Sequence, residues 1–166
     1  DSGILQDSIR VSPNQNSHST GRINGGSLTW GIFDPATPGT PNINSFSSYA
    51  TTPIFSIPSG YYTTSAMVII TSPDPNITIY YTTDGSHPDN TSTQYTTPIT
   101  FTQTTVLKAV AYSSSANILH SFIEYNTYFI DDTHTIPILS ISGEQVDDLL
   151  DGNGWIDPHG TAEYFS

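Results

Sequence analysis

The stretch ITIYYTTDG (77–85) decides the fold, because an alternating run ends there at a turn signal. Ile77, Ile79 and Tyr81 share one face of an extended chain, since successive strand side chains point to opposite faces. Asp84-Gly85 then favours a tight turn, because glycine adopts a positive φ without steric cost. The stretch therefore predicts a half-buried β-strand that ends in a turn.

Five further strand-like runs occur between residues 53 and 130, at the spacing typical of an all-β sandwich. They are PIFSIPSGYY (53–62), SAMVIIT (65–71), TQYTTPITF (93–101), TVLKAVAYS (105–113) and HSFIEYNTYFI (120–130). The run 105–113 is largely apolar on both faces, which predicts a central strand with Lys108 reaching an edge. No helical period appears in this part of the chain.

The polar segment after the turn is expected to carry the chain from one sheet to the other. Its hydroxyl, carboxyl and amide side chains can bond to their own backbone, as in short side-chain turns. These residues are Ser86, Asp89, Asn90, Thr91 and Ser92. A ligand-binding loop is the alternative interpretation of the same segment.

The charge balance excludes some classes of partner. The chain holds 15 Asp and Glu against 3 Lys and Arg, for a formal net charge of −12. Such a surface repels phosphate backbones, so we expect no nucleic-acid binding. No apolar run is long enough to span a bilayer, so we expect no membrane insertion. Cysteine is absent from the sequence, which excludes disulfides and leaves the compartment open.

Composition divides the 166 residues into four parts. Residues 1–42 are expected to be the C-terminal part of a β domain, with strands at SIRV (8–11) and SLTWGIF (27–33), a polar loop between them, and Trp30 packed against the next domain. Residues 43–52 are a linker and residues 53–130 the sandwich. Residues 131–166 begin a further domain, with strands at 136–142 and 161–166 and a short helix at 143–150. We expect the chain to be a piece of a longer protein.

The middle part resembles the C-terminal domain family of chitobiase and β-hexosaminidase. The resemblance rests on PIFSIPSGYY (53–62), VIITS (68–72), ITIYYTTDGSHPD (77–89), YTTPITF (95–101), VLKAVAY (106–112) and YNTYFI (125–130). It implies an immunoglobulin-like antiparallel β-sandwich with partial flanking segments. It also implies a domain that accompanies secreted enzymes and surface proteins and is not itself catalytic.

Both flanks resemble parts of other families. STGRINGG (19–26), TW (29–30) and TPGTPN (37–42) are similar to the end of a lamin-tail domain. HTIPILSIS (134–142) and GTAEYFS (160–166) are similar to the opening of spore-coat-protein-H-type kinase domains. The segments that carry phosphotransfer in that family would lie beyond residue 166, so no such residue is transferred to this chain. The order of the three parts resembles an arrangement of bacterial surface proteins.

Tyrosines are the candidate binding residues of the middle part. Flat exposed rings beside polar groups could stack on sugars, and Tyr61, Tyr62, Tyr80 and Tyr112 could form such a platform. Tyrosines of a sandwich also pack one ring face and leave the hydroxyl in water. Both interpretations are open from the sequence, and the platform would make polysaccharide a partner.

An acidic loop near the end of the chain carries the one metal-like pattern. Asp151, Asn153 and Asp157 match the centre of an EF-hand loop. Leu149 and Gly160 stand where that loop needs its first carboxylate and its bidentate Glu. A turn requires the same residue types, so a plain turn is the alternative. If calcium binds, we expect a dissociation constant on the order of 10⁻⁴–10⁻³ M.

No motif of a catalytic site is present. The five histidines have no metal-ligand spacing, and no GxSxG, P-loop or GxGxxG occurs. The pairs Asp131-Asp132 and Asp147-Asp148 are interpreted as solvated surface and not as a glycosidase pair. We therefore expect a chain that is not an enzyme and needs no cofactor.

The sequence favours a non-catalytic spacer module in a large exported bacterial surface protein, located outside the cell or on its surface. Its partners would be the neighbouring domains of the same polypeptide. One alternative is a carbohydrate-binding accessory module with a tyrosine platform. Another is the fragment of an enzyme whose catalytic part lies beyond residue 166.

Overall fold

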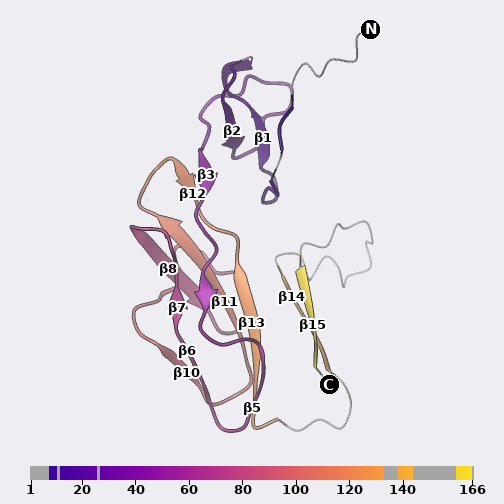
Figure 1. Cartoon of the computed structure of the whole chain (residues 1–166), viewed down its shortest axis with the longest axis vertical. Helices are drawn as coiled ribbons and strands as arrows, with labels where there is room; N and C mark the ends of the chain where they lie inside the picture. The colour runs from indigo at the N-terminus through magenta and orange to yellow at the C-terminus, as the bar shows by residue number, and fades with distance from the viewer. Residues whose placement is uncertain (1–7, 11, 26, 133–137, 144–159, 166) are drawn as a thin grey trace. The chain divides into compact units, whose positions relative to one another are not determined.

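The computed structural model describes residues 8–10, 12–25, 27–132, 138–143 and 160–165 (Figure 1). The chain forms two compact units, Asp1–Ser48 and Tyr49–Ser166, with the boundary inside strand β3 (Ser48–Tyr49). Within the described ranges, no helix has the length and apolar character needed to cross a membrane.

The first unit contains an antiparallel hairpin. Strand β1 (Ser19–Arg22) pairs with β2 (Trp30–Phe33), and the short 3-10 segment η1 (Ile23–Gly25) lies between them. The prediction of a polar loop over 12–26 was therefore wrong at β1, which has no apolar alternation and forms because β2 supplies backbone partners. The described residues 8–10 of the expected SIRV strand are not in a strand.

Side chains close the first unit around this hairpin. Phe33 is buried, and the Asn42 amide donates to the Arg22 carbonyl oxygen at 2.9 Å. The Arg22 guanidinium lies 4.8 Å from the centre of the Trp30 ring, within the range of a cation–π contact. The contact observed for Trp30 is thus one inside its own unit.

The second unit is built on a five-stranded sheet with the order β5-β13-β11-β8-β9. Its strands are β5 (Gly60–Tyr62), β8 (Ile77–Thr82), β9 (Thr93–Gln94), β11 (Thr105–Ser113) and β13 (Glu124–Ile130). Strand β11 lies between β13 and β8, as its two apolar faces predicted. All pairs are antiparallel except β5 with β13, which is parallel.

A second layer faces this sheet and consists of two strand pairs. Strand β4 (Ile54–Phe55) pairs with β7 (Ile70–Thr71), and β10 (Ile99–Phe101) pairs with β6 (Ala66–Val68). Strands β6 and β7 continue each other across Ile69. The Ile69 N–H donates to the Ser56 hydroxyl oxygen at 2.9 Å, and its carbonyl accepts from the Ser56 N–H at the same distance.

The chain changes layer twice where the sequence predicted one continuous strand. The run 53–62 supplies β4 to one layer and β5 to the other. The run 93–101 supplies β9 to the five-stranded sheet and β10 to the opposite layer. The segment 83–92 therefore returns to a neighbouring strand of its own sheet, and the expected change of layer occurs after it, around Pro98.

The core lies between the two layers. Val68 comes from one layer, Leu107 and Tyr128 come from the other, and all three are fully buried. Ala66, Ile70, Phe101, Ala109 and Ile130 complete the same cluster. The predicted fold class is confirmed: the chain is all-β, and its second unit is an immunoglobulin-like sandwich.

Strands also flank the sandwich. Strand β12 (Ile118–Leu119) pairs with β3, and β14 (Ile138–Gly143) pairs with β15 (Gly160–Phe165). Thr127 and Ser140 share a hydroxyl–hydroxyl hydrogen bond of 2.8 Å. The helix was predicted at 143–150; its first residue, Gly143, belongs to β14, and residues 144–150 lie outside the described residues. The predicted calcium ligands Asp151, Asn153 and Asp157 also lie outside them.

Candidate functional site

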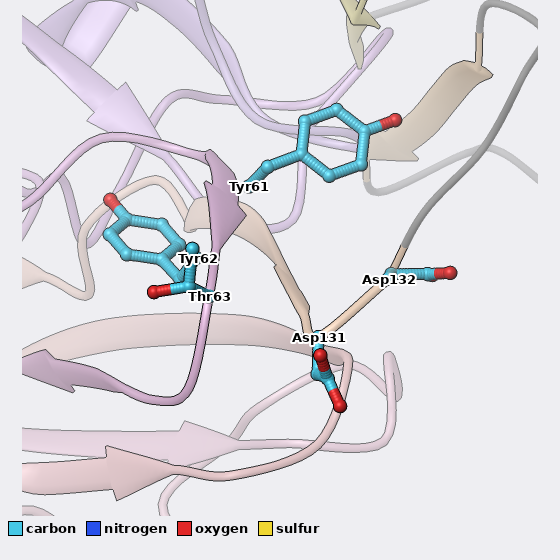
Figure 2. Close-up of a pocket in the computed structure, with 5 residues that line it drawn as sticks. All are labelled: Tyr61, Tyr62, Thr63, Asp131 and Asp132. Carbon is cyan, nitrogen blue, oxygen red and sulfur yellow. The ribbon is translucent and has the colours of Figure 1, made fainter.

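The four predicted tyrosines do not form one group in the sandwich. Tyr61 and Tyr62 are consecutive residues of β5, so their rings leave the strand on opposite sides, as Figure 2 shows. Tyr80 and Tyr112 come from the adjacent strands β8 and β11. The structure therefore brings Tyr80 and Tyr112 together and separates Tyr61 from Tyr62.

Tyr80 and Tyr112 meet edge to face. Their ring centroids are 5.7 Å apart with an interplanar angle of 85°. Tyr112 also contacts the His120 ring at 5.3 Å. Perpendicular rings do not present one flat surface to a sugar, and this geometry is the one that aromatic pairs adopt when they pack on each other.

The Tyr112 hydroxyl lies against the 84–92 segment. Burial raises the pKa of Tyr112, and the nearby Asp89 carboxylate raises it further, while a hydrogen bond with the Asn90 backbone acts in the opposite direction. The Tyr112 side chain therefore contacts the 84–92 segment at Asp89 and Asn90.

Side-chain turns hold this segment, as its sequence predicted. The Ser86 N–H donates to the Asp84 carboxylate at 3.0 Å, and the Thr91 N–H donates to the Asp89 carboxylate at 2.8 Å. Bonds from the neighbouring hydroxyl and N–H groups lower the pKa of both carboxyls. These bonds are all accepted by the Oδ1 atoms of the two carboxylates, and they hold the segment in its turns.

Tyr62 belongs to the packing of the sandwich. Its ring lies 5.9 Å from the ring of the buried Tyr128, and its hydroxyl donates to the Pro58 carbonyl oxygen at 2.7 Å. Burial raises the pKa of Tyr62. Both the ring and the hydroxyl of this residue therefore have structural partners.

Tyr61 has a different environment. Its ring stacks on Phe129 with centroids 5.0 Å apart and an interplanar angle of 26°. Phe129 is 7% exposed, whereas Tyr61 is 41% exposed. Phe129 thus supports one face of the Tyr61 ring while much of Tyr61 remains open to solvent.

A pocket of about 150 Å³ lies beside Tyr61, and Tyr61, Tyr62, Thr63, Asp131 and Asp132 line it (Figure 2). The Asp131 N–H donates to the Tyr62 carbonyl oxygen at 2.9 Å, so the segment after β13 is tied to β5. Asp131 has a φ of 50°, a left-handed conformation that Asp and Asn adopt more readily than most residues.

This pocket was not predicted from the sequence. Asp131-Asp132 was interpreted as solvated surface, because two adjacent acids after a strand are typical of an exposed hinge. The missing information was the parallel pairing of β5 with β13, which brings residues 61–63 beside residues 131–132. The position of two acids directly after the last predicted strand was the one available signal.

The pocket is lined by residues of β5, by Thr63 and by the two acids after β13. The carboxylates of Asp131 and Asp132 point away from the Tyr61 ring in Figure 2, so these side chains do not converge on one point. Within the described ranges, no group of three or more His, Cys, Asp and Glu side chains is arranged to hold a metal ion.

Comparison with known families gives one result for the sandwich. Residues 57–119 match the family model of the chitobiase/beta-hexosaminidase C-terminal domain. The match runs from just before β5 to β12 and includes all four predicted tyrosines. The chitobiase/beta-hexosaminidase C-terminal domain is a β-sandwich that accompanies glycosidases, so the match fits an accessory module. Asp131 and Asp132 lie outside the matched range. Neither the curated proteins nor the solved structures gave a significant match to the chain.

Proposed function

We propose that the sandwich is a non-catalytic accessory module that sets the distance and orientation between neighbouring domains of a large exported bacterial surface protein. The observation that carries the proposal is the path of the chain through this unit. The chain enters beside β3 and β12 and leaves after β13, at the opposite end of the sandwich (Figure 1). A module with its connections at opposite ends separates whatever is attached to them.

The entry segment is fixed to the sandwich by several contacts. The Asp74 carboxylate accepts from the Thr51 N–H at 2.6 Å and from the Thr51 hydroxyl at 2.9 Å. The Ala50 N–H donates to the Leu119 carbonyl oxygen at 2.8 Å. The Tyr49 ring lies 5.0 Å from the ring of Phe122. These contacts limit the directions in which a preceding domain could swing.

The exit is fixed in the same way. The Ile130 N–H donates to the Thr104 hydroxyl oxygen at 3.1 Å, and Asp131 is tied to Tyr62. The orientation of the last strand is therefore transmitted to residue 131. The partners in this proposal are a lamin-tail-like domain before the sandwich and a kinase-like domain after it, which rest on the sequence resemblances.

Two observations support a non-catalytic accessory role. The family match is to a domain that accompanies glycosidases, which also suggests an extracellular setting. The interior between the layers is filled by buried apolar side chains such as Val68 and Leu107, and the described pocket lies at the edge of the sheet. The absence of catalysis is itself part of the proposal, and hydrolysis of a chromogenic glycoside by this chain would contradict it.

Spin labels can test the spacer proposal cleanly, because the sequence contains no cysteine. Cysteines would be introduced by Thr52→Cys and Asp132→Cys, and the distance distribution between the labels measured by pulsed electron resonance. We expect a single narrow distribution that broadens when Asp74→Ala removes the anchor of Thr51. A broad distribution in the parent pair would contradict the proposal.

A second candidate function is carbohydrate binding, and the exposed Tyr61 ring on Phe129 is the observation that favours it. Saccharides stack on aromatic rings that are held flat and open to water. A glycan array probed with the whole chain tests this candidate. We expect binding that is weak and multivalent, and an array without any bound glycan would rule this function out.

A further inference from the structure

The layer opposite the five-stranded sheet carries exposed apolar side chains on its outer side. Val68 points into the core, so Met67 and Ile69 on either side of it point outward. Ile54 lies on the same side, because it pairs with Thr71, the next outward residue after Ile69. Ile54, Met67 and Ile69 are 55%, 58% and 40% exposed. We call this surface the outer face, and it consists of Ile54, Ser56, Met67, Ile69, Thr71 and Thr100.

The strands that form the outer face contain no charged residue. They lie within residues 53–73 and 90–107, and neither range holds an Asp, Glu, Lys, Arg or His. The remainder of the chain carries all 15 acidic and all 3 basic residues. This strongly acidic chain therefore presents a sheet face that is built without charge.

We propose that a second copy of the chain covers the outer face, in a two-fold symmetric pair whose outer faces pack on each other. An apolar face gains free energy when it leaves water, whereas a charge brought to it would lose hydration without an opposite charge in return. The partner must therefore bring an uncharged apolar surface. The outer face of another copy is such a surface, and a two-fold pair uses the same patch on both copies.

The distribution of charge favours this arrangement over other contacts between copies. Each copy has a formal net charge of −12, so acidic parts of two copies repel each other. Contact through the outer faces brings uncharged strands together. The next acid after β7 is Asp74, whose carboxylate accepts two hydrogen bonds from Thr51. The inference goes beyond the spacer proposal and does not depend on it, since that proposal concerns domains of one polypeptide.

The size of the outer face predicts weak pairing. The strands β4, β6, β7 and β10 have only two or three residues each. The face is therefore smaller than the roughly 800 Å² that each partner contributes to a standard interface, and we expect a dissociation constant on the order of 10⁻⁴ M. Copies concentrated on one surface would pair at this affinity.

Analytical ultracentrifugation of the whole chain tests the inference. The chain would be measured from about 10 μM to about 1 mM, in about 0.05 M and about 0.5 M NaCl. We expect the average mass to rise above that of one chain as the concentration increases. Association should be tighter at the higher salt concentration, because salt screens the repulsion between acidic copies. In an NMR dilution series, the amide shifts should centre on residues 54–56, 67–71 and 99–101.

Two substitutions on the outer face and one control separate this contact from general stickiness. Met67→Ser and Ile69→Ser should each raise the dissociation constant about tenfold, because a two-fold contact loses the side chain from both copies. Leu28→Ser is the matched control, since Leu28 is 89% exposed in the first unit, and it should leave the dissociation constant unchanged. An unchanged amide spectrum away from each substitution shows that the fold is intact.

Three results would overturn the inference. A chain that stays monomeric at about 1 mM in both salt concentrations would exclude a second copy as the occupant and leave the outer face to a different domain. Self-association that Met67→Ser and Ile69→Ser do not weaken would place the contact elsewhere. Association that weakens as the salt concentration rises would mean that opposite charges join the copies. None of these results changes the spin-label distance within one chain, so the spacer proposal is tested separately.

Discussion

The Phe101 ring lies stacked on the Tyr128 ring, with centroids 5.6 Å apart and an interplanar angle of 22°. Phe101 belongs to β10 in one layer and Tyr128 belongs to β13 in the other. The Tyr128 hydroxyl also donates to the Ile57 carbonyl oxygen at 3.2 Å. A single aromatic pair therefore joins the two layers and ties both to the segment between β4 and β5.

Replacing Phe101 should test how much the Phe101–Tyr128 pair contributes to the free energy of unfolding. Phe101→Ala removes a buried ring and leaves a cavity, so we expect the free energy of unfolding to fall by about 3–5 kcal/mol. Met67→Ala is a control on the paired strand β6, where Met67 is 58% exposed, and should change stability by less than about 0.5 kcal/mol. Denaturant unfolding followed by tyrosine fluorescence measures both, and equal effects would contradict the layer assignment.

Gly85 should resist substitution for a conformational reason. Its φ is 83°, and a Cβ atom built there would meet nothing within 4 Å. Gly85→Ala should therefore destabilise the sandwich by about 1–2 kcal/mol through backbone strain alone. Gly85→Asn should cost less, because Asn enters the left-handed region more readily. Thermal unfolding of the two variants gives the comparison, and an equal cost would point to a steric cause.

The 84–92 segment should loosen in acid. Hydrogen bonds lower the pKa of Asp89, so the stabilisation is present above the ordinary carboxyl pKa of about 4 and is lost as the pH falls through the lowered value. Thr91→Val removes the donor hydroxyl of Thr91 and should raise the Asp89 pKa toward its ordinary value. Carboxyl NMR titration measures this change. Thr82→Val removes a hydroxyl that bonds to Ser86 instead, and should leave the Asp89 pKa unchanged.

The Tyr112 hydroxyl should report the charge of Asp89. The pKa of Tyr112 is raised, so the neutral hydroxyl stabilises the fold below the ordinary value of about 10 and this contribution is lost as the pH rises through the raised value. Asp89→Asn removes one of the charges that raise the Tyr112 pKa, so this pKa should fall. Asp132→Asn should not change it. Titration of the tyrosine ring carbons by NMR distinguishes the two, and a shift in both would imply a general charge effect.

Much of the sandwich could be predicted, because apolar residues that a strand buries on one face recur at every second position of the sequence. The alternation of Ile77, Ile79 and Tyr81 and the two apolar faces of residues 105–113 gave β8 and β11 and their approximate limits. The side-chain turns of Asp84 and Asp89 could also be predicted, because they depend on residues two positions away. These features are local, or they reflect a single buried face.

The remaining features depend on partners distant in the sequence. Strand β1 is polar and is specified by β2, and the division of 93–101 between two layers depends on which strand each half meets. The pocket at Tyr61 arises from the pairing of β5 with β13, the first and the last strand of the five-stranded sheet in sequence order, which share no local pattern. The expected platform placed Tyr61 and Tyr62 together, although consecutive strand residues face opposite ways, and the sequence does not indicate which of the two is exposed.

The parallel pairing of β5 with β13 has a mechanical consequence. The register joins Gly60, Tyr61 and Tyr62 to Tyr128, Phe129 and Ile130 in the same direction. Tension that pulls residue 49 away from residue 130 would slide these two strands along each other, so their hydrogen bonds would carry the load together and not break one at a time. The sandwich should therefore unfold abruptly at a high force when it is stretched between residues 49 and 130.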